Sequence, residues 1–445
     1  MTTVLNYVAP LDQDNLPSAK SGTDLIQIQG GKRLNGTIEI SGAKNAALPL
    51  MCAALLTEDA VRFTNMPNTL RDMRTLTAVL QSLGAEVTAG PAGEMVIRAE
   101  TIDDAHADYE LVRQMRASIL VLGPLVARFG EAEVSLPGGC AIGTRPIDLH
   151  LMGLEAMGAK IDLQDGYVRA SAPNGLQGAA ITFAKVSVGA TENLMMAACL
   201  AKGKTTLINA AKEPEIVDLG ELLIAMGGQI EGLGTSTITI TGVERMNGAT
   251  HSVVADRIET GTYMIAVALT GGTLRLKNTQ LRFLEALVAP LKKAGVSFDV
   301  EGEDVIVHRN GTPLVGTDIM TEPFPGFPTD LQAQFMTMLT QCEGAGMVTE
   351  TIFENRFMHV PELCRMGANI TVHNGSAIVR GVKRLKGAEV MATDLRASVA
   401  LVLAGLVAEG TTTVNRIYHL DRGYENLVEK LQACGAEISR IRAIE

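Results

Sequence analysis

A dipeptide that ends in glycine recurs six times along the chain, each time at the end of an amphipathic segment. The glycines are Gly84, Gly158, Gly227, Gly295, Gly367 and Gly435, at a spacing of about 70 residues that fits one compact repeated unit. We expect each glycine to end a helix in the left-handed conformation, which glycine adopts without steric cost. Alternating polar and apolar residues follow, for example at 160–163, and predict strands. The chain therefore contains six copies of one α/β unit.

Each unit also carries a second helix that is apolar on nearly all sides and opens on polar residues. The openings begin at Gly42, Gln114, Val188, Asp256, Pro328 and Asp394. Helices of this kind are buried all round, so we expect them in the middle of the structure, with the sheets and amphipathic helices outside. Their N-termini then gather at one end, where free N–H groups and helix dipoles favour anions. Six units around one core would exceed the usual domain size, which favours three plus three.

Composition excludes several classes of function. The chain has 445 residues, 20% of them charged, a net charge of −11 and no tryptophan. The acidic balance and the scarcity of aromatic residues argue against a nucleic-acid partner, and the longest apolar run, 397–408, is too short to span a membrane. Residues 1–22 lack the pattern of a signal peptide, and we expect a flexible extension there. Six cysteines without zinc-site spacing indicate a reducing, cytoplasmic setting and no metal.

Residues 135–150 place a thiol on a glycine-rich loop. Gly138, Gly139 and Gly143 allow sharp turns and close approach of a ligand, and Arg145 would favour the thiolate of Cys140. The alternative is a buried structural cysteine beside an ordinary turn. The glycines and the arginine favour the reactive thiol.

Seven stretches carry a resemblance to a known family. They are 41–46, 137–143, 185–191, 327–330, 354–357, 394–396 and 421–424. On these stretches the chain resembles the UDP-N-acetylglucosamine enolpyruvyl transferases of the EPSP synthase superfamily, and the resemblance covers nearly the whole chain from about Leu25. It implies an α/β fold of two inside-out barrel domains, each of three βαβαββ-type units with buried central helices. It assigns 44–254 to domain 1 and 23–43 plus 255–445 to domain 2, with the active site in the cleft between them.

The resemblance also implies an activity. Family members transfer the enolpyruvyl group of phosphoenolpyruvate to the 3′-hydroxyl of UDP-N-acetylglucosamine and release phosphate, by addition and then elimination, in the first committed step of peptidoglycan precursor synthesis. No cofactor is implied. Two alternatives are a 5-enolpyruvylshikimate-3-phosphate synthase-like transferase, which lacks such a cysteine loop, and a non-catalytic nucleotide-sugar sensor on the same scaffold. The sequence leaves the oligomeric state open.

By resemblance, one group of residues surrounds phosphoenolpyruvate, with Lys44 and Arg422 also catalytic. The group is Lys44, Asn45, Arg116, Arg145, Arg396 and Arg422. Arginine suits such a substrate because its planar fork binds carboxylates and phosphates through paired hydrogen bonds. Any one of these arginines alone could equally form a surface ion pair.

Two further catalytic residues are implied. Cys140 matches the family thiol that protonates the methylene carbon, forms the covalent adduct with phosphoenolpyruvate and is alkylated by fosfomycin. Asp330 matches the general base for the sugar hydroxyl. We expect its apolar setting to raise its proton affinity, and a role as a helix N-cap is an alternative or additional reading.

The resemblance places the nucleotide sugar against two loops and implies two supporting residues. The predicted contacts are Asn45, Arg116, Arg145, Pro146, Ile147, Asp148, Leu149, Lys185, Val186, Ser187, Val188, Gly189, Asp330 and Ile352. Arg356 and Asp394 are expected to support the site, and His150 and His359 to cap or pack.

Overall fold

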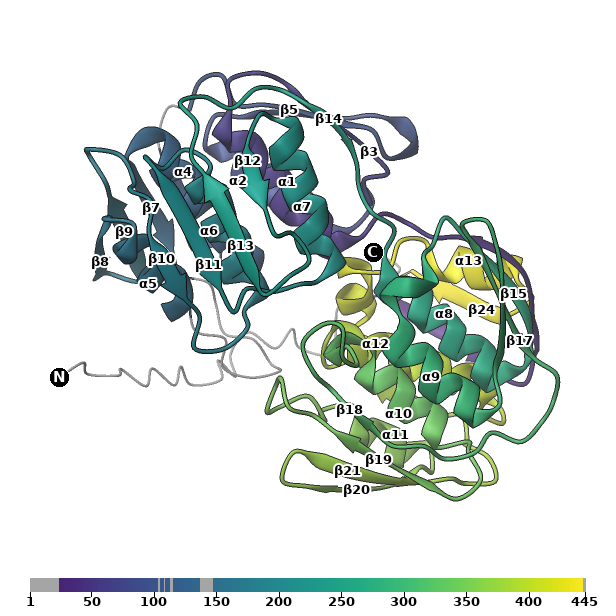
Figure 1. The fold of residues 1–445 in the computed structure, drawn as a ribbon. Coiled ribbons are helices and arrows are strands. Elements are labelled where there is room, and N and C mark those ends of the chain that lie inside the picture. Colours follow the sequence, from purple (N-terminus) through teal and green to yellow (C-terminus); the bar gives the residue numbers. More distant parts are fainter. Residues whose placement is uncertain (1–23, 103–104, 108, 113–114, 137–146, 443–445) are drawn as a thin grey trace.

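The computed structural model describes residues 24–102, 105–107, 109–112, 115–136 and 147–442, which form two lobes (Figure 1). Each lobe has its own hydrophobic core. The first core is built from residues between 43 and 253, and the second from residues 26–40 together with residues between 258 and 438. We refer to these two parts as the first and the second lobe. Large chains divide in this way because single cores stop growing beyond about 250–300 residues.

Within the described residues, three four-stranded sheets of one topology surround the first core. In spatial order they are β14 (Thr250–Ser252), β3 (Val61–Thr64), β5 (Met95–Arg98) and β4 (Glu86–Ala89); β6 (His106–Ala107), β7 (Glu131–Ser135), β9 (Tyr167–Ser171) and β8 (Lys160–Gln164); and β10 (Ala180–Thr182), β11 (Lys204–Ile208), β13 (Thr237–Thr241) and β12 (Gln229–Glu231). In each sheet the first two strands are parallel and the other neighbours antiparallel.

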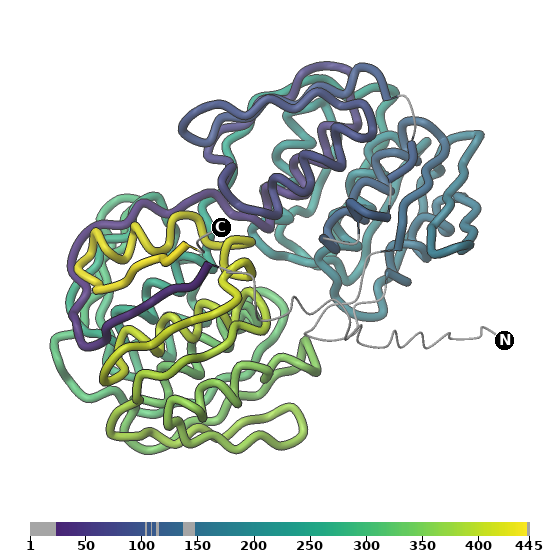
Figure 2. The backbone as a smooth tube through the Cα atoms, turned by 180° about the vertical axis from the view of Figure 1, so that it is seen from behind, coloured from purple at the N-terminus to yellow at the C-terminus, as the bar shows by residue number. Residues whose placement is uncertain are grey.

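The second core has three sheets of the same kind, again within the described residues. They are β2 (Leu34–Glu39), β15 (Gly272–Lys277), β17 (Asp304–Arg309) and β16 (Ser297–Glu301); β18 (Ile319–Met320), β19 (Ala345–Thr349), β21 (Ser376–Arg380) and β20 (Asn369–His373); and β22 (Glu389–Met391), β23 (Thr411–Asn415), β1 (Leu25–Gln29) and β24 (Glu437–Ile441). The N-terminal strands β1 and β2 thus complete two sheets of the second lobe, and Figure 2 shows them beside the C-terminal segments.

The helices fall into a buried set and an outer set. The buried helices are α1 (Lys44–Ala53), α4 (Leu122–Phe129) and α6 (Val188–Ala198) in the first lobe, and α8 (Arg257–Thr270), α10 (Gln332–Leu339) and α12 (Leu395–Val407) in the second. The outer helices are α2 (Arg71–Ser82), α5 (Asp148–Ala156), α7 (Pro214–Ala225), α9 (Glu285–Ala294), α11 (Val360–Arg365) and α13 (Leu427–Ala433). Short helical turns are α3 (Tyr109–Val112), η2 (Ala54–Leu56), η3 (Pro91–Gly93), η4 (Arg116–Val121), η5 (Leu281–Phe283), η6 (Thr329–Leu331) and η7 (Ile417–Arg422).

The buried helices pack against one another as their apolar sequences require. Helix α6 contacts α1 and α4, and α8, α10 and α12 contact each other. Along the chain, β6 to β9 alternate with helices α4 and α5 in the order strand, helix, strand, helix, strand, strand. The expected α/β fold of βαβαββ units with central helices is therefore confirmed.

All six repeat glycines adopt the predicted left-handed conformation. Their φ angles lie between 90° and 106°, each directly follows an outer helix or its cap residue, and a strand begins two residues later. A residue with a Cβ is strained there, because the Cβ approaches the following carbonyl oxygen. This conformational demand explains why glycine recurs at these six positions.

We expect Gly367→Ala to lower the free energy of unfolding by about 1–2 kcal/mol. A Cβ at Gly367 would meet nothing within 4 Å, so the loss comes from the backbone and not from a clash. Gly367→Asn is the matched control and should lose less, because asparagine tolerates the left-handed region. Urea unfolding of both variants measures the difference, and equal stability of the alanine variant and the wild type would contradict the assignment.

Two segments cross between the lobes and pair with each other. Gly42 and Ala255 form an antiparallel bridge, the Ala43 N–H donates to the Val254 carbonyl at 2.7 Å, and the Asp256 N–H donates to the Ser41 carbonyl at 2.8 Å. A Cβ on Gly42 would lie 1.8 Å from the Asn65 carbonyl oxygen. The crossing therefore requires glycine, and it fixes the start of α1 beside the start of α8.

Candidate active site

Lys44, Asp72 and Arg422 form a charged cluster where the lobes meet. Lys44 is the first residue of α1 and Asp72 lies in the first turn of α2, both in the first lobe, whereas Arg422 ends η7 in the second. The Lys44 ammonium lies 3.1 Å from Asp72 Oδ2, and Arg422 Nε donates to Asp72 Oδ1 at 2.8 Å. One buried carboxylate thus binds two cations from different lobes.

The electrostatics of this cluster are strongly coupled. Burial lowers the pKa of Lys44, and Arg396 and Arg422 lower it further, while Asp72 opposes the shift. Burial raises the pKa of Asp72, but Lys44 and Arg422 outweigh burial and hold it below its ordinary value. Asp72 is therefore ionised beside two cations, and it is the carboxylate that stabilises the charge of Lys44.

Asp330 is held by two arginines. It lies in η6 immediately before α10, where Arg356 Nη2 donates to its Oδ1 at 2.8 Å and Arg396 Nη2 donates to its Oδ2 at 2.6 Å. Both guanidinium groups are buried, with side chains 5–6% exposed. Arg396 belongs to the first turn of α12, so the predicted general base contacts one of the predicted phosphoenolpyruvate residues.

Two expectations for Asp330 are wrong. Burial raises the pKa of this carboxyl, as expected from its apolar setting, but Arg396 and Arg356 overcome burial and bring the pKa well below the ordinary value of 3.8. Asp330 is also not a helix N-cap, since Pro328 holds that position and no side chain caps η6. The apolar neighbours of Asp330 in the sequence give no sign of the two arginines, which are 26 and 66 residues away along the chain.

A buried hydroxyl network positions Arg396 from behind. The Tyr424 hydroxyl accepts from Arg396 Nη1 at 3.3 Å and lies 3.0 Å from the hydroxyl of Thr262. Gln334 Nε2 donates to Tyr424 Oη at 3.2 Å and to the Asp330 carbonyl at 2.9 Å. Tyr424 belongs to the 421–424 stretch, but its role here was not predicted.

Asp394 and Glu350 fix the local backbone. Asp394 is the N-cap of α12, and its Oδ1 accepts from the backbone N–H groups of Arg396 and Ala397. Buried Glu350 accepts from the hydroxyls of Thr321 and Thr329, both at 2.9 Å, and from two backbone N–H groups, those of Ile352 at 2.8 Å and Phe353 at 3.1 Å. Glu350, which sequence reasoning missed, thus joins the segment beside Asp330 to the segment that contains Ile352.

The predicted nucleotide-sugar residues lie at two helix starts of the first lobe. Ser187 caps α6, its hydroxyl accepting from Ala190 N at 3.3 Å, so Val188 and Gly189 open that helix after Lys185 and Val186. Ile147 is the residue before α5, and Asp148 and Leu149 open it. Free N–H groups at such starts suit phosphate oxygens.

His150 packs between these two helix starts. Asn193 Nδ2 lies 3.0 Å from its Nδ1, and burial, with a smaller effect of the charge on Arg116, lowers the pKa of His150 to about 3. His359 is similarly buried, and its pKa falls to about 4 chiefly through burial. Both rings are neutral at physiological pH and packed, as expected.

The structure does not join every predicted residue. Cys140, Arg145 and Pro146 lie outside the described residues. Asn45 is exposed beside Lys44. Among the residues that the structure describes, no hydrogen bond or ion pair connects 185–189 with the Asp330 group. Both predicted groups are divided between the lobes. Of the phosphoenolpyruvate residues, Lys44, Asn45 and Arg116 lie in the first lobe and Arg396 and Arg422 in the second, and of the nucleotide-sugar residues, 147–149 and 185–189 lie in the first lobe and Asp330 and Ile352 in the second.

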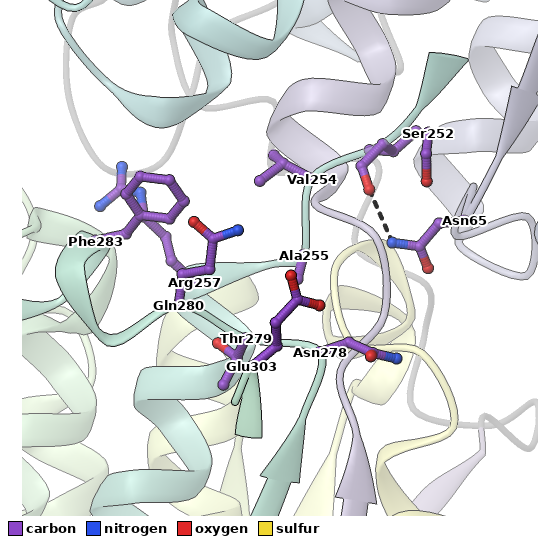
Figure 3. A pocket seen from close by; sticks show the side chains of 11 residues that line it. Asn65, Ser252, Val254, Ala255, Arg257, Asn278, Thr279, Gln280, Phe283 and Glu303 are labelled. Atoms are coloured by element: carbon purple, nitrogen blue, oxygen red, sulfur yellow. Dashed lines mark hydrogen bonds between the residues drawn. The ribbon is translucent and has the colours of Figure 1, made fainter. Parts of the chain in front are cut away.

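A pocket of about 400 Å³ lies beside the crossing segments (Figure 3). Arg257, Phe283, Gln280 and Glu303 line it together with residues 252–255. None of the predicted site residues belongs to its lining. In the described part of the chain, no helix is long and apolar enough to span a membrane, and no group of three or more His, Cys, Asp or Glu side chains is arranged to hold a metal ion.

Comparison with known proteins identifies the class to which this fold and these two charged clusters belong. The model of the family described as EPSP synthase (3-phosphoshikimate 1-carboxyvinyltransferase) matches residues 28–431. The solved structure of the enolpyruvyl transferase NikO from Streptomyces tendae is 27% identical, with a TM-score of 0.85 over 95% of this chain and 100% of that one. An EPSP synthase from Acinetobacter baumannii, 18% identical, shares the fold with a TM-score of 0.71 over 94% of this chain and 100% of that one.

Curated relatives are more similar still. The relative from Rhodospirillum centenum is 58% identical over 429 residues, which are 94% of this chain and 99% of that protein. The relative from Caulobacter vibrioides is 59% identical over 422 residues, which are 94% of this chain and 98% of that protein. Both are named UDP-N-acetylglucosamine 1-carboxyvinyltransferase. The chain belongs to the EPSP synthase family, in the group of the UDP-N-acetylglucosamine 1-carboxyvinyltransferases. The resemblance found in the sequence motifs is thereby confirmed.

Proposed function

We propose that this enzyme transfers the enolpyruvyl group of phosphoenolpyruvate to the 3′-hydroxyl of UDP-N-acetylglucosamine and releases inorganic phosphate. The observation that carries the proposal is the gathering of three cations at the lobe boundary. Lys44 and Arg422 pair there with Asp72, and Arg396, whose charge acts on Lys44, pairs with Asp330. Phosphoenolpyruvate carries a phosphate and a carboxylate, and these cations can neutralise both. The names and identity of the relatives support the acceptor.

Asp330 is the proposed general base for the sugar hydroxyl, and its two arginines set its strength. A base whose pKa lies well below the working pH removes protons poorly. Arg396 is also the proposed ligand of the phosphoenolpyruvate carboxylate. When that carboxylate binds Arg396, it shares the positive charge that now depresses the pKa of Asp330, so substrate binding strengthens the base.

The remaining roles follow the sequence prediction. Cys140 protonates the methylene carbon, carries the covalent adduct and is the site of alkylation by fosfomycin, and Arg145 and Arg116 bind phosphoenolpyruvate. Main-chain N–H groups of 187–189 bind the diphosphate, and Lys185 adds positive charge. Residues 146–149 and Ile352 contact the nucleotide sugar, and Arg356 and Asp394 keep Asp330 and Arg396 in place. We also propose domain limits of 44–254 and 23–43 plus 255–445, supported by the two cores. A cytoplasmic location agrees with five free thiols among the described cysteines.

The test is phosphate release from phosphoenolpyruvate with UDP-N-acetylglucosamine, run beside shikimate 3-phosphate and beside enzyme treated with fosfomycin. We expect phosphate release with UDP-N-acetylglucosamine as the acceptor but not with shikimate 3-phosphate, and we expect this release to be lost after alkylation by fosfomycin. Release with shikimate 3-phosphate would point instead to the EPSP synthase reaction. Binding of the nucleotide sugar without any release would point to a non-catalytic sensor.

A further inference from the structure

Asp72 is a buried carboxylate at the candidate active site to which neither the motifs nor the proposed mechanism assigns a role. The residue is 3% exposed and both of its oxygens face cations, Oδ2 at 3.1 Å from Lys44 Nζ and Oδ1 at 2.8 Å from Arg422 Nε. A second, longer contact of 3.5 Å joins Arg422 Nη2 to Oδ2. Because Arg422 comes from the second lobe, the carboxylate fixes the separation of two cations that no local structure holds together.

A second contact joins the same two segments. Thr69, three residues before Asp72, donates to Glu425 Oε1 from its backbone N–H at 3.1 Å and from its hydroxyl at 2.7 Å. Glu425 lies three residues after Arg422. Residues 69–72 and 422–425 therefore dock side by side across the lobe boundary. The Thr69–Glu425 contact is exposed and involves neither Lys44 nor Arg422.

The charges around Lys44 show what Asp72 provides. Arg396 and Arg422 both repel its ammonium group, and Asp72 opposes them by favouring its charged form. Asp256 also faces Lys44, through a long hydrogen bond of 3.4 Å to its backbone N–H. Three cations converge at the start of α1, and such an arrangement persists only when anions compensate it.

Both cations keep donors for a further anion. An ammonium group has three donors and a guanidinium group five, and Asp72 engages one of the former and two of the latter. We propose that Asp72 is a positioning residue that holds Lys44 and Arg422 side by side, so that both donate to the phosphate of phosphoenolpyruvate. Asp72 acts through these cations and does not touch the substrate. This inference rests on the proposed function.

The test compares the KM for phosphoenolpyruvate with the KM for UDP-N-acetylglucosamine in variants of the full-length enzyme. For Asp72→Asn we expect the KM for phosphoenolpyruvate to rise about 10- to 100-fold, the range for losing charge-assisted hydrogen bonds, while the KM for UDP-N-acetylglucosamine stays within about threefold, as for a site that does not contact Asp72. Asp72→Glu keeps the charge and should recover part of the loss. Glu425→Gln is the matched control, because it weakens the neighbouring contact between the same segments, and it should leave both KM values unchanged.

A double-mutant cycle separates positioning from general damage. If Asp72 acts through Arg422, the effects of Asp72→Asn and Arg422→Gln on the KM for phosphoenolpyruvate are less than additive. Fully additive effects, an unchanged KM for phosphoenolpyruvate in Asp72→Asn, or an equal rise of both KM values would overturn the proposal, and the cycle with Asp72→Glu replaces Asp72→Asn if the latter does not fold. Absence of phosphate release by the wild type would instead reject the proposed function.

Discussion

Asp330→Asn is expected to lower kcat for phosphate release by about 10²- to 10⁴-fold, the usual contribution of a positioned general base. Asparagine keeps the shape of the side chain and one acceptor oxygen, but it cannot take the proton of the sugar hydroxyl. The side chain of Asp330 is 25% exposed, so a substrate hydroxyl can reach it. Lys185 and the helix start at Ser187 are not in contact with Asp330, and the Kd for UDP-N-acetylglucosamine should change little by comparison.

The experiment measures kcat by phosphate release and the Kd of the nucleotide sugar by titration calorimetry. Asp299→Asn is the matched control, because Asp299 lies in the same lobe, is exposed and pairs with His308 on the neighbouring strand. We expect wild-type kcat for that variant. Asp330→Asn with more than a tenth of wild-type kcat would show that another group removes the proton.

Arg396→Ala is expected to lower kcat/KM for phosphoenolpyruvate by about 10²- to 10⁴-fold, which corresponds to the cost of about 3–5 kcal/mol for removing one partner of a buried ion pair. The guanidinium binds Asp330 in the free enzyme and the substrate carboxylate in the proposed complex, so one change removes both interactions. Arg396→Lys keeps the charge without the planar fork and should lie between the alanine variant and the wild type. Equal kcat/KM in the alanine variant and the wild type would exclude Arg396 from substrate binding.

The same variant carries a pH signature in its stability. Because the folded-state pKa of Asp330 lies well below its ordinary 3.8, the stability that its ion pairs contribute is present above the unfolded value and is lost as pH falls through the folded value. Arg396→Ala raises the folded pKa toward 3.8, so it reduces this contribution. The difference in unfolding free energy between wild type and variant should have its largest value near pH 7 and become smaller as the pH falls below 3.8. Urea unfolding across this range measures it, and a difference that does not depend on pH would contradict the pairing.

The repeated architecture could be predicted because its signals are local. A helix C′ residue with positive φ favours glycine at that position whatever surrounds it, so six glycines mark six helix ends. Runs of apolar residues predict the buried helices, as in α6 and α12. The place of β1 and β2 in the second lobe has no such signal, because strand pairing joins Ile26 to Val414 across nearly the whole chain.

The site was predicted unevenly for a related reason. Lys44, Arg396 and Asp330 belong to recognisable stretches, and the structure brings them together. Asp72 is the second residue of an amphipathic helix, where an acidic residue is ordinary, and nothing around it in the sequence indicates that Arg422 lies 350 positions away on the same carboxylate.

The sequence by itself determined the six α/β units, the buried helices, the family and the residue types at the site. Only the tertiary structure decided which charges meet, and with them the pKa directions of Lys44, Asp72 and Asp330. The physical reason is the distance along the chain over which each kind of interaction acts. Backbone conformation and apolar periodicity depend on neighbours within a few residues, whereas the energy of a charge depends on its distance from every other charge and on how much water remains around it.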